Sequence, residues 1–115
     1  MGNVYVIEPE IESKFFPEKI EAIFSWDLMD TSLQSISTCI LRDHLTVIGF
    51  GWAIENPNDD FDLDIGEQWA YKRAIKSMTN NICNRTKSSF SLPFRKEIDT
   101  KMRQALYKAR NENGK

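Results

Sequence analysis

The chain has 115 residues, of which 41% are hydrophobic and 28% are charged. This length fits a single domain over residues 1–115, and this composition excludes wholesale disorder and a fibrous repeat. No apolar run approaches the roughly 18 residues that a membrane span needs, and the first residues lack both a secretion signal and the Ser or Thr that myristoylation requires at position 6. We therefore expect a cytoplasmic protein with no membrane partner.

The net charge of −2 conceals an asymmetry along the chain. Residues 1–70 carry 3 basic and 14 acidic side chains, a balance of −11, whereas residues 71–115 carry 12 basic and 3 acidic ones, a balance of +9. Clustered lysine and arginine create a positive potential that attracts nucleic acid or an acidic protein. The alternative is that the two halves face each other or are simply solvated.

The first third of the chain predicts strands. Residues 4–7 predict a short strand, and an irregular segment or a helical turn follows at residues 10–16. From 19 to 28, apolar and polar residues alternate, which is typical of a half-buried strand. Its inward-facing positions are Ile20, Ala22, Phe24, Trp26 and Leu28.

Residues 32–54 predict a β-hairpin that turns at Arg42, Asp43 and His44, although the turn lacks the Asn-Gly pair that would define its register. If Asp43 and His44 form the loop, one face looks like the core. That face comprises Leu33, Ser35, Ser37, Cys39 and Leu41 with Thr46, Ile48, Phe50, Trp52 and Ile54. The opposite face is also low in polar residues, so we expect it to be exposed, covered by the N-terminal strand, or covered by a partner chain such as a second copy.

Two helices follow an acidic segment. Asp64 and Glu67 have the spacing of a capping box, so a helix should begin there. Its apolar stripe comprises Tyr71, Ala74, Ile75, Met78 and Ile82, extended at the start by Ile65 and Trp69. A second, basic helix is predicted over 92–111, with an apolar seam of Phe94, Ile98, Met102, Ala105 and Ala109.

These elements indicate an α+β fold, in which a three-stranded antiparallel sheet is followed by two helices. The sheet has four strands if residues 4–7 join it. The β-β-β-α core would span 19–83, and the helix at 92–111 would be an addition to it.

Two motifs that could mark a binding site lack the residues that such a site requires at fixed positions. Gly49-x-Gly51 lacks the third glycine and the immediate helix of a dinucleotide fingerprint, so we interpret these glycines as a bulge or as a place where a helix or partner backbone lies close. The acidic segment has Asp64 and Ala70 where a calcium loop needs Gly and Glu. No metal site is expected there.

The remaining reactive residue types are few. Cys39, Cys83 and His44 cannot supply the roughly four ligands of a zinc site. We interpret Cys39 as a small apolar residue in a strand, Cys83 as a helix-end residue and His44 as an exposed turn residue. No catalytic residue, metal or cofactor is therefore expected, and the chain is predicted not to be an enzyme.

Two charged clusters are candidates for binding a partner. The acidic cluster comprises Asp59, Asp60 and Asp62, which could imitate nucleic-acid charge toward a basic groove on another protein. The basic cluster could contact phosphates or an acidic partner. It comprises Lys72, Arg73, Lys76, Arg95, Lys96 and Arg103.

The stretch from 49 to 75 resembles the signature of small β-β-β-α domains of uncharacterised function from actinobacteria and bacteriophages. The pattern is G-x-G-x-A, P-x-D, I-G-(D/E) and A-x-x-R-A, supplied by Gly49, Gly51, Ala53, Pro57, Asp59, Ile65, Gly66, Glu67, Ala70, Arg73, Ala74 and Ile75. The resemblance covers about residues 19–82 and implies a fold like that of double-stranded RNA-binding domains. Those domains use a basic helix start, whereas this helix start is acidic.

The sequence thus predicts a small, non-enzymatic binding protein. With the phage-like signature, the first hypothesis is a phage-encoded protein that docks on a host protein, such as a nucleic-acid-processing or defence protein, and inhibits it. The alternative is direct nucleic-acid binding through the basic helices. A third is a homo-oligomer joined through the second sheet face.

Overall fold

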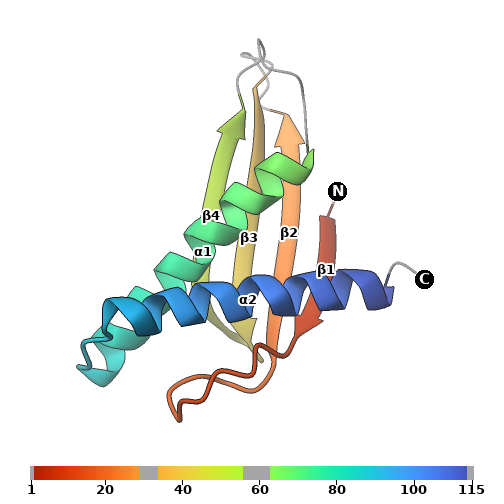
Figure 1. The fold of residues 1–115 in the computed structure, drawn as a ribbon. Helices are drawn as coiled ribbons and strands as arrows, with labels where there is room; N and C mark the ends of the chain where they lie inside the picture. The colour runs from red at the N-terminus through yellow and green to blue at the C-terminus, as the bar shows by residue number, and fades with distance from the viewer. Residues whose placement is uncertain (1, 29–33, 56–62, 114–115) are drawn as a thin grey trace.

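The computed structural model describes residues 2–28, 34–55 and 63–113. A four-stranded antiparallel sheet has the order β1-β2-β3-β4, and two helices lie together on one of its faces (Figure 1). The predicted α+β fold is confirmed, with residues of the N-terminal strand forming the fourth strand. The elements are β1 (Gly2–Ile7), β2 (Ile20–Leu28), β3 (Ser35–Asp43), β4 (Thr46–Glu55), α1 (Leu63–Thr86) and α2 (Leu92–Asn113).

The β3–β4 hairpin turns one residue later than predicted, and its register differs. Arg42 and Asp43 still pair with β4, so the turn consists of His44 and Leu45, and His44 adopts a left-handed conformation at φ 54°. Pairing then shifts: Arg42 lies opposite Val47, but Leu41 lies opposite Gly49. Ile48 is therefore the extra residue of a β-bulge.

This bulge reverses the predicted faces of β4. Because side chains alternate along a strand, one extra residue exchanges the inward and outward sets. Gly49, Gly51 and Ala53 face the helices, while Phe50, Trp52 and Ile54 lie on the open face and are exposed. The prediction that these three large residues belong to the core is wrong.

Gly49 and Gly51 allow α1 to lie directly against β4. A Cβ atom on Gly51 would sit 2.2 Å from the Ala70 carbonyl oxygen and 2.4 Å from the Ala74 amide nitrogen. A Cβ on Gly49 would sit 2.6 Å from the Ala74 carbonyl oxygen. Only glycine fits this close approach, so the predicted helix contact is confirmed, whereas the bulge lies at Ile48 and not at either glycine.

The core lies between the sheet and the helices. β2 and β3 contribute Ile20, Ala22, Phe24, Cys39 and Leu41, and the predicted apolar stripes of both helices cover them, with Phe94 partly buried at the border. The prediction that Ile65 and Trp69 extend the buried stripe of α1 is wrong, since both side chains are about half exposed. Trp69 precedes Tyr71 by two residues, roughly 200° around the helix, so it points away from the core. Leu28, at the end of β2, is also exposed.

One side of α1 runs along the outer edge of β4 and caps it. Asn81 donates to the Ile48 carbonyl at 3.1 Å, the Phe50 amide donates to the Ser77 hydroxyl at 3.3 Å, and Arg73 donates to the Trp52 carbonyl at 2.6 Å. Arg73, Ser77 and Asn81 are four residues apart and therefore share one helix face. They satisfy backbone groups that an edge strand would otherwise offer to another chain.

Candidate functional site

The predicted basic residues gather between the two helices. Five of the six line two neighbouring hollows between α1 and α2, which we call the basic groove. Lys72, Arg73, Lys76, Arg95 and Arg103 line it, whereas Lys96 is exposed on α2 and lines neither hollow. The predicted acidic residues Asp59, Asp60 and Asp62 lie outside the described residues.

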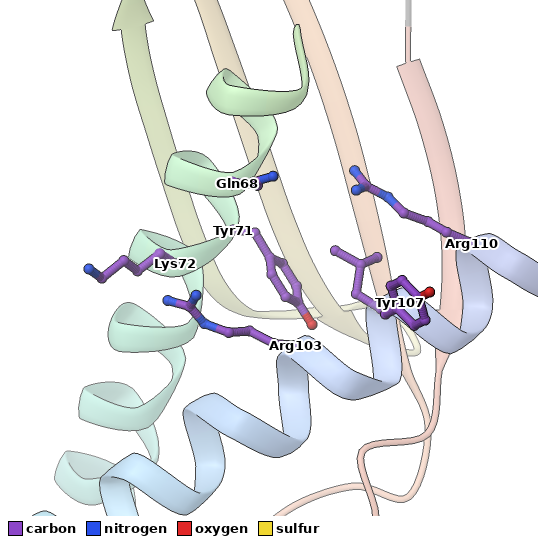
Figure 2. A pocket seen from close by; sticks show the side chains of 7 residues that line it. Gln68, Tyr71, Lys72, Arg103, Tyr107 and Arg110 are labelled. Atoms are coloured by element: carbon purple, nitrogen blue, oxygen red, sulfur yellow. The ribbon is translucent and has the colours of Figure 1, made fainter. Parts of the chain in front are cut away.

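The first hollow has a volume of about 220 Å³ and lies between the N-terminal half of α1 and the C-terminal half of α2 (Figure 2). Its inner wall is Tyr71, whose hydroxyl donates to the Met102 carbonyl at 2.5 Å. Burial raises the pKa of Tyr71, so this hydroxyl stays neutral and joins the helices. The hollow is lined by Gln68, Tyr71, Lys72, Arg103, Leu106, Tyr107 and Arg110.

Arg110 lines this hollow and is partly buried. Its guanidinium donates to the carboxylate of Glu67, which is buried, and lies 5.6 Å from the ring centroid of Phe24 and 5.7 Å from that of Tyr5. Glu67, predicted as part of a capping box, thus pairs with the second helix. Its carboxylate neutralises Arg110, so this arginine is not available to a ligand phosphate.

The second hollow, of about 390 Å³, carries the exposed cations. Lys72 and Arg73 lie over the Trp69 ring, at 5.1 and 5.6 Å from its centroid, which is typical of cation–π contacts. Among the described residues, Lys72, Arg73 and Lys76 have no carboxylate within 4.0 Å. Their charge is therefore available to an anionic partner.

The other two arginines of the groove are held in place. Arg103 pairs with Asp99 at 2.9 Å, one helical turn earlier. Arg95 donates to the Phe90 carbonyl at 3.3 Å, to Asn80 at 3.0 Å and to the Cys83 sulfur at 3.5 Å, which ties the start of α2 to α1. These arginines shape the groove and contribute partial positive potential to it.

A third hollow, of about 480 Å³, lies where α1 meets the open face of the sheet. It is lined by Phe50, Gly51, Trp52 and Ile54 of β4, and by Arg73 of α1. Both helices lie on the opposite face (Figure 1), so these side chains stay accessible. Sequence reasoning placed them in the core because the bulge at Ile48 has no clear local signal.

Sequence reasoning also missed Tyr107, which is 71% exposed beside the first hollow. The spacing of the helix could have indicated it: Tyr107 follows Arg103 by four residues and precedes Arg110 by three, so all three share a face of α2. An aromatic residue on a polar, basic helix face marks a surface more often than a core.

The residue types that carry catalysis are spread out. His44 is exposed in the hairpin turn, 3.8 Å from Asp43. Cys39 and Cys83 are buried free cysteines, and burial raises the pKa of Cys39, so its thiol stays protonated at neutral pH. In the described parts of the chain, no cluster of three or more His, Cys, Asp or Glu could hold a metal ion.

Within residues 2–28, 34–55 and 63–113, neither helix is long and apolar enough to cross a membrane. Comparison of the chain with protein-family models, curated proteins and solved structures finds no match. The resemblance to the β-β-β-α domains of actinobacteria and phages therefore stays a prediction from the motif.

Proposed function

We propose that this is a non-enzymatic protein that binds nucleic acid through the basic groove between α1 and α2. The observation that carries the proposal is the convergence of five cationic side chains from two helices on one groove. Within it, Lys72, Arg73 and Lys76 have no carboxylate within 4.0 Å among the described residues, and Asp99, which lines the same hollow, pairs with Arg103, so these three cations can pair with phosphates.

The expected interaction is electrostatic and depends on salt. Each phosphate contact releases condensed counterions, so the logarithm of affinity falls with the logarithm of salt concentration by roughly 0.7 to 0.9 per contact. Three available cations therefore predict a slope of about −2 to −3. The overall charge of −2 does not oppose this, because the positive charge is concentrated in residues 71–115.

Fluorescence anisotropy with labelled oligonucleotides tests the proposal. The double variant Lys72→Gln/Lys76→Gln should weaken binding and make the salt slope shallower by about 1.5. A matched control, Lys96→Gln/Lys108→Gln, removes the same charge from exposed positions of α2 that line neither hollow. Equal losses in both variants would argue for diffuse attraction, and no binding at about 50 mM salt would overturn the proposal.

A second candidate function is docking on a host protein, as a phage-encoded inhibitor acting in the host cytoplasm. The exposed apolar side chains Phe50, Trp52 and Ile54 favour it, because neighbouring apolar side chains exposed on a surface are typical of protein contacts. The acidic residues Asp59, Asp60 and Asp62 are the proposed charged part of that contact.

A pull-down with matched variants separates this candidate from nucleic-acid binding. A host protein captured by the wild type, lost with Asp59→Asn/Asp60→Asn/Asp62→Asn and kept with Lys72→Gln/Lys76→Gln would support inhibition. Capture that depends on the lysines and disappears after nuclease treatment would argue against it. If the apolar face joins two copies instead, light scattering would give a dimer mass that Trp52→Ser reduces to a monomer.

A further inference from the structure

Three hollows adjoin one another on the surface, and we call this series of hollows the path. The first and second share Lys72, and the second and third share Arg73. The path therefore runs from the C-terminal half of α2, across α1, to the open face of β4. Lys72 and Arg73 are adjacent in sequence, so the junctions between hollows lie next to each other on α1.

Each hollow combines an exposed aromatic ring with at least one cation. Tyr107 lies beside the first hollow, Trp69 beside the second and Trp52 beside the third. Trp69 is 48% exposed and Trp52 is 47% exposed, so each ring retains accessible surface. Lys72 and Arg73 are the cations that adjoining hollows share, and Lys76 is a further cation of the second hollow.

Arg73 physically joins the last two aromatic residues. Its guanidinium donates to the Trp52 carbonyl and lies over the ring of Trp69. This arrangement positions a positive charge beside the Trp69 indole and the backbone of Trp52, at the corner where α1 meets the edge of β4. A chain that follows the path would meet aromatic, cationic and aromatic groups in turn.

This alternation fits unpaired bases better than a duplex. In a duplex the faces of the bases are stacked on each other, whereas single strands can place their bases on aromatic side chains while the backbone follows nearby cations. An acidic peptide could form ion pairs with the lysines and Arg73, but it has no bases to stack on the three rings.

We propose that the three hollows form one track for single-stranded nucleic acid. Bases stack on Trp69 and Trp52, and on Tyr107 at the far end, while Lys72, Arg73 and Lys76 contact the phosphates. The inference rests on the proposed nucleic-acid binding and adds the strandedness of the ligand and a role for the open face of β4.

The test compares single strands and duplexes of the same sequence, about 20 nucleotides long, by anisotropy. Oligo(dT) and oligo(U) form two arms, because DNA and RNA single strands share this chemistry. Trp69→Ala and Trp52→Ala should each weaken single-strand binding roughly 5- to 150-fold, as expected for one lost base stack, without changing the salt slope. Lys76→Gln should make the slope shallower by about 0.7.

Two controls separate stacking from misfolding and from plain charge. Phe15→Leu removes another exposed ring that carries a cation, with Lys14 5.4 Å from its centroid, at a place outside the three hollows. It should leave affinity unchanged. Quenching of tryptophan fluorescence by oligo(dT) should fall in Trp69→Phe, a substitution that keeps an aromatic ring.

The outcomes distinguish the two proposals. Equal affinity for single strands and duplexes, with silent tryptophan variants and sensitive lysine variants, would overturn the single-strand track and leave nucleic-acid binding in place. Complete competition by polyglutamate at matched charge, with no tryptophan quenching, would also overturn the track. Absence of any oligonucleotide binding would overturn the function itself.

Discussion

The two sides of α1 use charged and aromatic residues in opposite ways. On the inner side, the buried Glu67 pairs with the partly buried Arg110, and the Tyr71 hydroxyl is hydrogen-bonded to α2. On the outer side, Trp69 is half exposed and Lys72 and Lys76 face solvent. Residue type alone therefore does not identify a binding site, because burial and partners decide whether a cation stabilises the fold or remains available to a ligand.

The largest expected effect is on the inner side, at the Glu67–Arg110 pair. Arg110→Leu leaves the buried Glu67 carboxylate without this arginine and should lower the free energy of unfolding by about 3 kcal/mol. Urea unfolding measures the change. The double variant Glu67→Leu/Arg110→Leu should recover most of the loss, because it removes both charges. A loss below about 0.5 kcal/mol in Arg110→Leu would contradict this prediction, because it would show that the pair contributes no more than an exposed surface ion pair.

The contact between α1 and β4 should be nearly as sensitive. Gly51→Ala forces a Cβ atom into the backbone of α1 and should cost about 1–3 kcal/mol, since neither the strand nor the helix can give way locally. Ala53→Gly, two residues along the same inward face, controls for a change of β propensity at this strand. Thermal denaturation measures both. Unchanged stability in Gly51→Ala would contradict the close approach.

Removing the Tyr71 hydroxyl should have a moderate effect that depends on pH. Tyr71→Phe loses the bond to the Met102 carbonyl and should cost about 1 kcal/mol at pH 7. The folded state holds the pKa of Tyr71 above its usual value, so above about pH 10 only the unfolded chain releases this proton and stability falls as pH rises.

Comparing urea unfolding at pH 8 and above pH 10 checks this sign. The wild type should lose more stability over that interval than Tyr71→Phe, which has no proton to release. Tyr107→Phe is the matched control, because Tyr107 is exposed. An equal pH dependence in wild type and Tyr71→Phe would show that the hydroxyl ionises as freely in the folded state as in the unfolded chain.

The smallest effect on stability belongs to the outer side. Lys72→Gln/Lys76→Gln should change the free energy of unfolding by less than about 0.5 kcal/mol, because neither lysine is paired with a carboxylate among the described residues. Calorimetry would measure this. The same variant should show the loss of nucleic-acid binding stated above, so a large destabilisation would contradict the assignment of these lysines to a binding surface.

Local patterns correctly predicted the elements. The alternation in β2 and the stripes from Tyr71 to Ile82 and from Ile98 to Ala109 depend on the periods of strands and helices, which are properties of neighbouring residues. The prediction failed where one extra residue changed the outcome. The bulge at Ile48 inverts β4, and no local pattern separates a core strand from one whose large side chains face outward.

The candidate site was predictable in part. The surplus of lysine and arginine after residue 70 indicated a basic region, and five of the six chosen residues line one groove. The bond that ties Arg95 of this set to Asn80 was not predictable, because the two residues lie 15 positions apart along the chain. Sequence spacing says nothing about pairing at that separation.

Short-range periodicity and composition fix the order of strands and helices, the inward stripes of both helices and the asymmetry of charge, so these could be predicted from the chain. Long-range contacts fix which face of β4 is covered, which arginine is neutralised by Glu67 and where Trp52 lies relative to Arg73. The physical reason is that these properties depend on the bulge and on the contact of α1 with two glycines, which join segments distant in the chain.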